Sequence, residues 1–520
     1  MTHCCRFSRV VLPVVTAAAC VADRPQASAP LAYYESYDPR SLDPALSTDV
    51  PTGEMVTLLY DGLTRFDPNG ALAAALADRW TVDSQGLRYV FHLRPAVKFH
   101  DGSPLTAEAV RRSFLRVLDP RSTGGRAWPL LPIAGAREHA AGTAADVRGI
   151  ETLGDTAVAL TLALPLAVFP KFLAMPVASI VPANPPPDLG AQPVGTGPWR
   201  FAAWAHDDAL RFVRNPDYWG GAPLAESLVV RIIPDQLVRA AELESGRLDV
   251  VEVPFGETAR WRERHLAWLQ EKPALRVTYI ALNNRRGALR DARVRQAINH
   301  AVNVAQILTT VWSGRGIRAR GAIPPSLAGG DTTRTAYAYD PERAKRLLAE
   351  AGQANGLSLQ LWRTADNVTL GRVAQAVQAD LAQVGIRVEL VERDASSQRE
   401  AARAGNADMA LLDWWADYPD GDNFLYPLFS SASFGPGGNY AFYSDPVTDS
   451  LILQARRTLD DGTRTALYRT IDARVYQAAP WLYLWFPVDL WAQAPAITGW
   501  ELPVIFNGQR WTTVRRAPPP

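Results

Sequence analysis

A pattern of helix end, glycine turn and apolar strand occurs at two distant places in the chain and constrains the fold most. Residues 242–253 (ELESGRLDVVEV) and 401–414 (AARAGNADMALLDW) both pass from a helix end through a glycine and a short turn to an Asp and an apolar strand. Two copies are too few for a solenoid. Because no long low-complexity linker separates them, they predict two α/β lobes with a ligand cleft between them.

Periodicity elsewhere supports α/β units. Apolar residues at helical spacing predict helices over 107–118, 291–311, 340–352 and 370–384. The third of these helices begins at Asp340-Pro341, where Asp caps the free N–H groups and Pro suits the first helical position. Residues 386–391 alternate apolar and charged side chains, as a half-buried strand does. The proline-rich run at 182–187 predicts a connection between lobes or a surface loop.

Composition narrows the class of protein. Hydrophobic residues make up 48% of the 520 residues and charged residues 21%, which excludes global disorder. Lys and Arg number 54 against 53 Asp and Glu, so the basic excess of a nucleic-acid binder is missing and we expect no nucleic-acid partner. The 16 Trp residues suggest an aromatic-lined binding site.

The N-terminus has the order of an export signal over residues 1–19. Two arginines precede an uncharged apolar run that ends in three alanines, and this run is far shorter than the about 20 residues of a bilayer span. Cys20 follows directly and resembles the lipidated cysteine of a bacterial lipobox, although Ala17 stands where lipoboxes usually carry Leu. We expect a tether over 20–30 and a periplasmic or cell-envelope location, with a lipid anchor at Cys20 or, alternatively, a freely soluble exported protein.

A collinear series of motifs covers nearly the whole chain after this signal. The motifs are SLDPA (41–45), LYDGLTRFDPNG (59–70), YVFHLRPAVKFHDGSPLTAEAV (89–110), GTGPWRF (195–201), RNPDYWGG (214–221), ALNNRRGALRDARVRQAINHAVN (281–303) and ADYPDGDNFLYPLFSS (416–431). GTGP is not a phosphate loop, because it lacks the Gly-Lys-Ser/Thr ending. In this series the chain resembles the family 5 extracellular solute-binding proteins of bacterial ABC importers, the oligopeptide- and dipeptide-binding group.

The resemblance implies an α/β fold of the two-lobed periplasmic binding protein type (type II, cluster C-like) with an inserted subdomain. It implies a first lobe from 31–50, 176–280 and 489–520, the insert at 51–175, and a second lobe at 281–488. Two crossover strands would form a hinge, and the lobes would close on ligand.

The segment 414–429 (WWADYPDGDNFLYPLF) carries the richest chemistry for a ligand site. Peptide capture needs an anion for the α-ammonium, backbone groups for the amides and roomy pockets for side chains. The resemblance places Asp417 at the position that pairs with the α-amino group, and Trp414 at an aromatic of the same site. Trp415 departs from the pattern of the relatives, since a peptide-binding member of the family has a small Cys there. Asp417 as a turn cap is the alternative.

Five further residues are site candidates by resemblance or neighbourhood. Asp38 matches an acidic position near the cleft, and Trp485 and Phe486 align near an aromatic run, with a buried apolar strand as their alternative. Arg363 and Arg372 are candidates for the ligand carboxylate because Arg offers a planar fork, and surface charge is the alternative role for both.

We therefore expect a monomeric, non-enzymatic binding module for a small peptide or similar solute. It would deliver the ligand to an ABC permease whose ATPase subunits lie on other chains, and it would touch the membrane only through a lipid anchor. Other solutes of the family are nickel chelates, opines and sugars. An exported hydrolase is the alternative of another class, yet no G-x-S-x-G stands in a strand-turn-helix setting. A chaperone-like interaction protein is a weaker third option.

No cofactor and no metal site are expected. The seven His residues are scattered without metal-ligand spacing, and all three cysteines lie within the first 20 residues.

Overall fold

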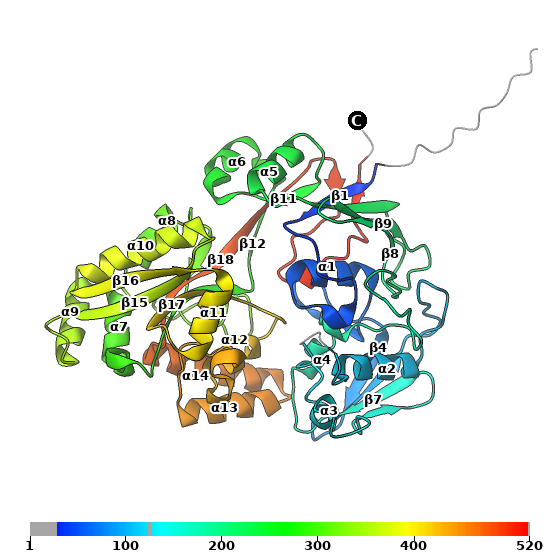
Figure 1. Ribbon diagram of the computed structural model, residues 1–520, viewed down its shortest axis with the longest axis horizontal. Helices are drawn as coiled ribbons and strands as arrows, with labels where there is room; N and C mark the ends of the chain where they lie inside the picture. Colours follow the sequence, from blue (N-terminus) through cyan, green and yellow to red (C-terminus); the bar gives the residue numbers. More distant parts are fainter. Residues whose placement is uncertain (1–28, 123–125, 518–520) are drawn as a thin grey trace, which may run out of the picture.

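The computed structural model describes residues 29–122 and 126–517. The chain forms two halves that stand side by side and are joined at one end (Figure 1), as the predicted two-lobed α/β architecture requires. The predicted export signal, Cys20 and most of the predicted tether lie outside the described residues. Within the described ranges, no helix is long and apolar enough to cross a membrane.

The largest sheet has eight strands in the order β11-β18-β13-β17-β15-β16, with β12 and β14 also pairing with β18, and it extends from the left half in Figure 1 to the top of the molecule, where β11 and β12 lie. Its strands are β11 (Val250–Glu252), β12 (Leu269–Pro273), β13 (Arg276–Leu282), β14 (Gly316–Arg318), β15 (Leu357–Thr364), β16 (Ile386–Arg393), β17 (Met409–Trp415) and β18 (Trp481–Gln493). The helices of this half are α7 (Ala292–Ala301), α8 (Val304–Thr310), α9 (Pro341–Glu350), α10 (Val368–Ala382), α11 (Ala395–Ala404), α12 (Asp422–Phe429), α13 (Pro446–Arg457) and α14 (Asp461–Ala478).

The right half contains two four-stranded sheets. The upper sheet has the order β1-β10-β9-β8, and its strands are β1 (Leu31–Glu35), β8 (Trp199–Ala205), β9 (Ala209–Arg214) and β10 (Ser227–Ile232). The lower sheet has the order β4-β5-β7-β6, and its strands are β4 (Ala77–Val82), β5 (Arg88–Leu93), β6 (Ile150–Thr152) and β7 (Ala157–Thr161). The accompanying helices are α1 (Val50–Leu59), α2 (Ala107–Leu118), α3 (Ala136–Ala140) and α4 (Phe169–Phe172).

The remaining elements are short. They are the pairs β2 (Thr64–Phe66) with β3 (Leu72–Ala74) and β19 (Ile497–Thr498) with β20 (Arg515–Arg516), and the helices α5 (Gln236–Glu244) and α6 (Thr258–Arg264), which lie at the top of Figure 1.

Two crossover connections join the halves. The first part of β18 pairs with β13 and β14, and its last part pairs with β11 and β12. The second crossover is the two-residue step Ala274–Leu275 between β12 and β13. Such thin connections between rigid sheets allow hinge closure. The domain boundaries expected from the sequence stay a prediction.

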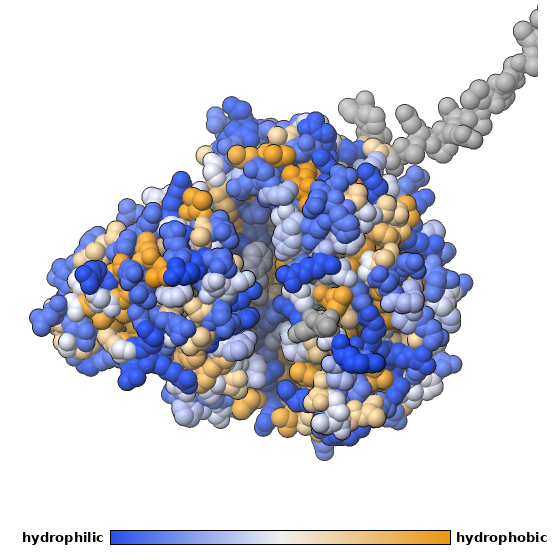
Figure 2. Space-filling view, viewed as in Figure 1, coloured by the Kyte–Doolittle hydropathy of each residue, from blue (hydrophilic) through white to orange (hydrophobic). Residues whose placement is uncertain are grey.

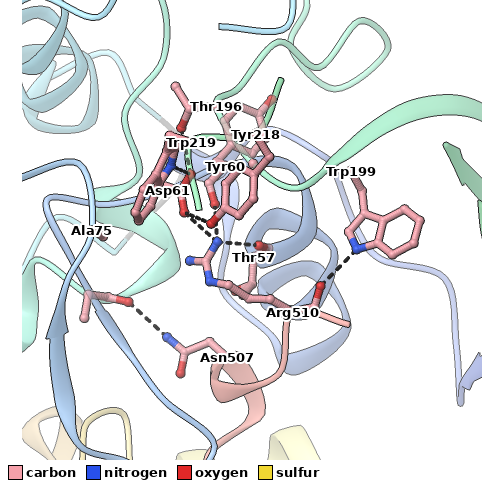
Figure 3. Close-up of polar contacts among 12 residues, drawn as sticks. Thr57, Tyr60, Asp61, Ala75, Thr196, Trp199, Tyr218, Trp219, Asn507 and Arg510 are labelled. Carbon is pink, nitrogen blue, oxygen red and sulfur yellow. Dashed lines mark hydrogen bonds and ion pairs between the residues drawn. The ribbon is translucent and has the colours of Figure 1, made fainter. Parts of the chain in front are cut away.

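A buried carboxylate explains why several of the motifs occur together. Asp61 of the LYDG motif is completely buried and accepts hydrogen bonds from the Trp219 indole at 2.9 Å and the Thr196 hydroxyl at 3.0 Å (Figure 3). The Arg510 guanidinium donates to the same carboxylate at 2.6 Å. A charge without water needs this complete set of partners. The motifs around residues 61, 196 and 219 therefore meet at one structural centre.

The glycines of GTGP have a packing reason. A Cβ atom on Gly195 would lie 2.1 Å from the Leu59 carbonyl oxygen, and one on Gly197 would lie 2.4 Å from the Leu59 carbonyl carbon. The loop therefore lies directly against the end of α1, where only glycine fits.

Most predicted elements are confirmed. Asp340 caps α9 by accepting a hydrogen bond from the Arg343 amide, and both copies of the helix-turn-strand pattern form, as α5 with β11 and as α11 with β17. The single helix predicted over 291–311 is wrong. The backbone is extended at Val302, and Asn303 caps a new helix by accepting from the Gln306 amide. This local cap breaks the helix in two, although the apolar periodicity of the sequence continues across the break.

Candidate ligand cleft

A cavity of about 1030 Å³ lies between the two halves. Figure 2 shows it as a groove that runs down the middle of the molecule. Its lining includes many aromatic side chains, which are Tyr33, Tyr34, Tyr37, Trp414, Trp415, Tyr440, Trp491, Trp500, Phe506 and Trp511. Ligand sites combine such surfaces with a few placed polar groups, so the cavity has the composition that the Trp content suggested.

The loop that follows β17 presents its side chains to this cavity. Trp414, Trp415 and Asp417 all line it. Asn423 holds the loop in shape, because its side-chain oxygen accepts from the Trp414 indole at 3.1 Å and from the Asp417 amide at 3.2 Å. The Asp417 carboxylate also has a side-chain hydrogen bond with Asn423, so this residue positions both the loop and the carboxylate beside the cavity.

The charged partner of Asp417 in this structure is Arg126, which comes from the other half of the molecule. One Arg126 nitrogen lies 3.3 Å from the carboxylate, and the Asp417 side chain is 23% exposed. Burial raises the pKa of Asp417, and the nearby Arg126 charge opposes this rise. Asp417 and Arg126 therefore form an ion pair across the cleft.

The neighbouring acids have structural partners instead. Asp420 accepts from Lys171 at 2.6 Å and from the Tyr468 hydroxyl at 2.7 Å. Asp422 accepts from the Tyr418 hydroxyl at 2.8 Å at the start of α12. Neither lines the cavity, whereas Asp417 does. The structure thus separates one carboxylate that faces the cavity from two that hold the loop.

Trp415 lies at the hinge and is 55% exposed. The Arg276 guanidinium stacks 4.1 Å from its ring centre, an arrangement that a cation–π attraction stabilises. The same Arg276 donates to Asp489 of β18 at 3.5 Å, and burial raises the pKa of Asp489 to about 6. Both crossovers are therefore connected through groups that line the cavity.

The other five sequence candidates do not line the cavity. Trp485 is fully buried against Trp312, with ring centres 5.1 Å apart, and Phe486 is also buried in the apolar core. Both are on β18, whose first half is covered on both faces.

The polar candidates are occupied or exposed. Arg363 pairs with Glu392, and Arg372 is exposed on α10. Asp38 accepts hydrogen bonds from the Trp204 indole at 3.2 Å and the Asp207 amide at 2.8 Å, so it fastens the β8–β9 hairpin.

Six arginines that the sequence analysis did not single out line the cavity, and two of them stand out by their spacing. Arg399 and Arg403 are four residues apart on α11, so both lie on the same face of the helix. This spacing was readable in the sequence, but it did not show that the helix faces the cleft.

The two halves also contact each other at the lower end of the cleft. Tyr418 packs edge-on against Phe172 at 4.9 Å and lies 6.3 Å from the Trp128 ring. Lys171 also donates to the Pro419 carbonyl at 2.8 Å. The cleft is therefore narrowed at this end by contacts that run directly into the Asp417 loop. No group of three or more His, Cys, Asp or Glu side chains among the described residues is placed to hold a metal ion.

Comparison with known proteins places this arrangement in a family. The model of the bacterial extracellular solute-binding proteins, family 5 (middle region), matches residues 71–436. The di/tripeptide-binding protein 2 of Pseudomonas aeruginosa is 34% identical over 485 residues, covering 89% of this chain and 91% of the relative. The heme-binding protein A of Haemophilus influenzae is 31% identical, covering 85% and 84%.

A solved structure shows the same fold with a ligand. The periplasmic binding protein DppA of Helicobacter pylori, in complex with the peptide STSA, superposes with a TM-score of 0.78 at 29% identity and covers 94% of this chain and 98% of that protein. Together with the two halves, the hinge and the cleft described above, these matches show that the chain belongs to the family 5 bacterial extracellular solute-binding proteins.

Proposed function

We propose that this chain captures a small peptide between its lobes and delivers it to a membrane permease driven by ATPase subunits on other chains. The observation that carries the proposal is Asp417, a carboxylate held by Asn423 and directed into a large cavity between the lobes. The names of similar relatives point the same way, since one is a di/tripeptide-binding protein and one structure holds a peptide.

Different residues of the cavity recognise different parts of the peptide. Asp417 receives the α-ammonium and exchanges Arg126 for it. Trp414 and Trp415 bound the side-chain pockets. Arg399 and Arg403, which line the cavity, bind the carboxylate end of the peptide. Arg363 is unsuited to this role, because its guanidinium is already paired with Glu392.

We also propose that the chain binds its ligand without chemical change and works as a monomer in the periplasm or cell envelope, held by a lipid on Cys20. Members of the family are periplasmic solute-binding proteins, which supports the location. Cys20→Ser should then release the protein in soluble form. The intact mass of this variant, made in a native-type host, should lack the lipid increment of the wild type. An unmodified Cys20 in that host would refute the anchor and leave export intact.

The test of function begins with the ligand itself. Native mass spectrometry of protein purified without refolding should show a bound species with a peptide mass, and a thermal-shift screen of short peptides should identify binders. Peptidase activity measured on the same peptides should stay at background. A co-purified heme, sugar or metal chelate with no peptide binder would refute the peptide class, and turnover of the peptides would refute the binding role.

A further inference from the structure

The wall of the cleft opposite Asp417 contains a second acidic site. Glu35 ends β1, Glu54 lies in α1, and both line the cavity. Glu35 is only 7% exposed, and its Oε1 atom accepts no hydrogen bond from any donor in the described part of the chain. A buried carboxylate oxygen without a donor is costly. The Glu35 Oε1 atom therefore needs a hydrogen-bond donor that the described part of the chain does not supply.

A proton takes the place of that partner. The carboxyls of Glu35 and Glu54 hydrogen-bond to each other, and Glu54 also bonds the Tyr33 hydroxyl. Two carboxylates cannot bond in this way unless one of them carries a proton, because the ionised form only accepts. Burial raises the pKa of Glu54 to about 7, and burial together with Glu54 raises the pKa of Glu35 well above its usual range. The pair holds its proton close to neutral pH.

The arginines nearby are engaged elsewhere. Arg239 donates to the Ser36 hydroxyl at 3.0 Å and stacks over the Tyr34 ring at 4.4 Å, and its charge only partly opposes the shift at Glu35. Arg40 lies 3.5 Å from Asp49, with a side chain 74% exposed to solvent. Three carboxyls, those of Glu35, Glu54 and Asp49, thus face two guanidiniums, and the proton shared by the glutamates supplies the missing positive charge.

We propose that Glu35 and Glu54 receive a second cationic group of the ligand, the guanidinium or ammonium of an arginine or lysine side chain. This inference rests on the proposed function, with Asp417 holding the α-ammonium on the other wall. Tyr33 and Trp491 stack with ring centres 6.3 Å apart and line the same cavity, where they can cover the aliphatic part of such a side chain. The incoming cation replaces the shared proton, which passes to solvent, so that one charge replaces another.

The test compares peptides that differ only in this charge. Tripeptides of alanine with one arginine, at the first, second or third position, are matched with the same peptides carrying citrulline, which has arginine's shape but no charge. Calorimetric titration at pH 8 should show at least one arginine peptide binding about tenfold or more tightly than its citrulline match. Because binding expels a proton, this advantage should shrink as pH falls from 8 to 6, and titration in two buffers of different ionisation heat should show proton release for the arginine peptide alone.

Variants assign the effect to the two glutamates. Glu54→Gln and Glu35→Gln keep the shape and should each remove most of the arginine advantage and the proton release, while citrulline peptides bind as before. Glu226→Gln, at an exposed pair with Arg214, is the matched control and should change neither. Equal affinity for arginine and citrulline peptides in the wild type would overturn the inference and leave the peptide function standing. Failure of every peptide to bind would overturn both.

Discussion

Replacing Asp417 by Asn tests the site most directly, because it removes a charge and keeps the shape. The backbone contact from the Asp417 amide to Asn423 does not depend on the carboxylate, so the loop should persist. Loss of a desolvated charge partner costs about 2–5 kcal/mol. Here the side chain is 23% exposed and Arg126 competes for it at 3.3 Å, which favours the lower part of that range. We expect a loss of about 2–3 kcal/mol, or roughly 30- to 150-fold in Kd.

The assay is calorimetric titration with a peptide and its N-acetyl derivative. Acetylation removes the ammonium and should weaken binding to the wild type by a similar factor. The two changes together should cost much less than their sum, since both remove the same contact. Asp38→Asn is the control, because Asp38 does not line the cavity, and its affinity should stay within about twofold of the wild type.

A second test changes Arg126 and predicts an effect on affinity of the opposite sign. If the ligand ammonium displaces this guanidinium, Arg126→Gln should strengthen binding, because the competitor for Asp417 is gone. Wild-type affinity in Asp417→Asn, or additive effects of the variant and acetylation, would refute the assignment of the α-ammonium to Asp417.

Three further predictions concern stability, all measured by urea unfolding. Lys171→Met should lower the free energy of unfolding by about 2–4 kcal/mol, because Asp420 is only 6% exposed and would keep its charge without its cation; a change below about 0.5 kcal/mol would contradict this. Gly195→Ala should lower it by about 1–3 kcal/mol through the clash with α1, whereas Gly256→Ala, which has open space around it, should change it by less than about 0.5 kcal/mol; equal effects would refute the packing argument. Two arginines lower the pKa of Glu242 to about 2, so its stabilising contribution is complete above the unfolded pKa and is lost as pH falls toward 2. Glu242→Gln should therefore reduce the fall in the free energy of unfolding between pH 5 and pH 2.5. An unchanged dependence on pH would contradict the assignment of this effect to Glu242.

Local chemistry explains which parts of the fold were predictable. The Asp340 cap and the alternation in β16 are encoded within a few residues, so their elements could be located from the sequence. The break at Asn303 is also local, but a capping Asn inside an unbroken apolar period is indistinguishable from a surface Asn.

The candidate site was less accessible because its members come from distant segments. The resemblance singled out Asp417, but only the positions of Lys171 and Tyr418 show how Asp420 and Asp422 are held. Arg126 is 291 residues away from the carboxylate that it contacts. Likewise, an apolar run such as the first half of β18 does not indicate whether its aromatics face a cleft or a core.

The course of β18 through both halves has a consequence for the order of folding. This strand is central in the large sheet and supplies partners to β11, β12, β13 and β14, yet it begins only at Trp481. A nascent chain that ends before this residue leaves β13 with an open edge and β11 and β12 without their pairing strand. The large sheet that joins the two halves cannot be completed until almost the whole polypeptide has been made, so its cooperative folding has to wait for the last few dozen residues.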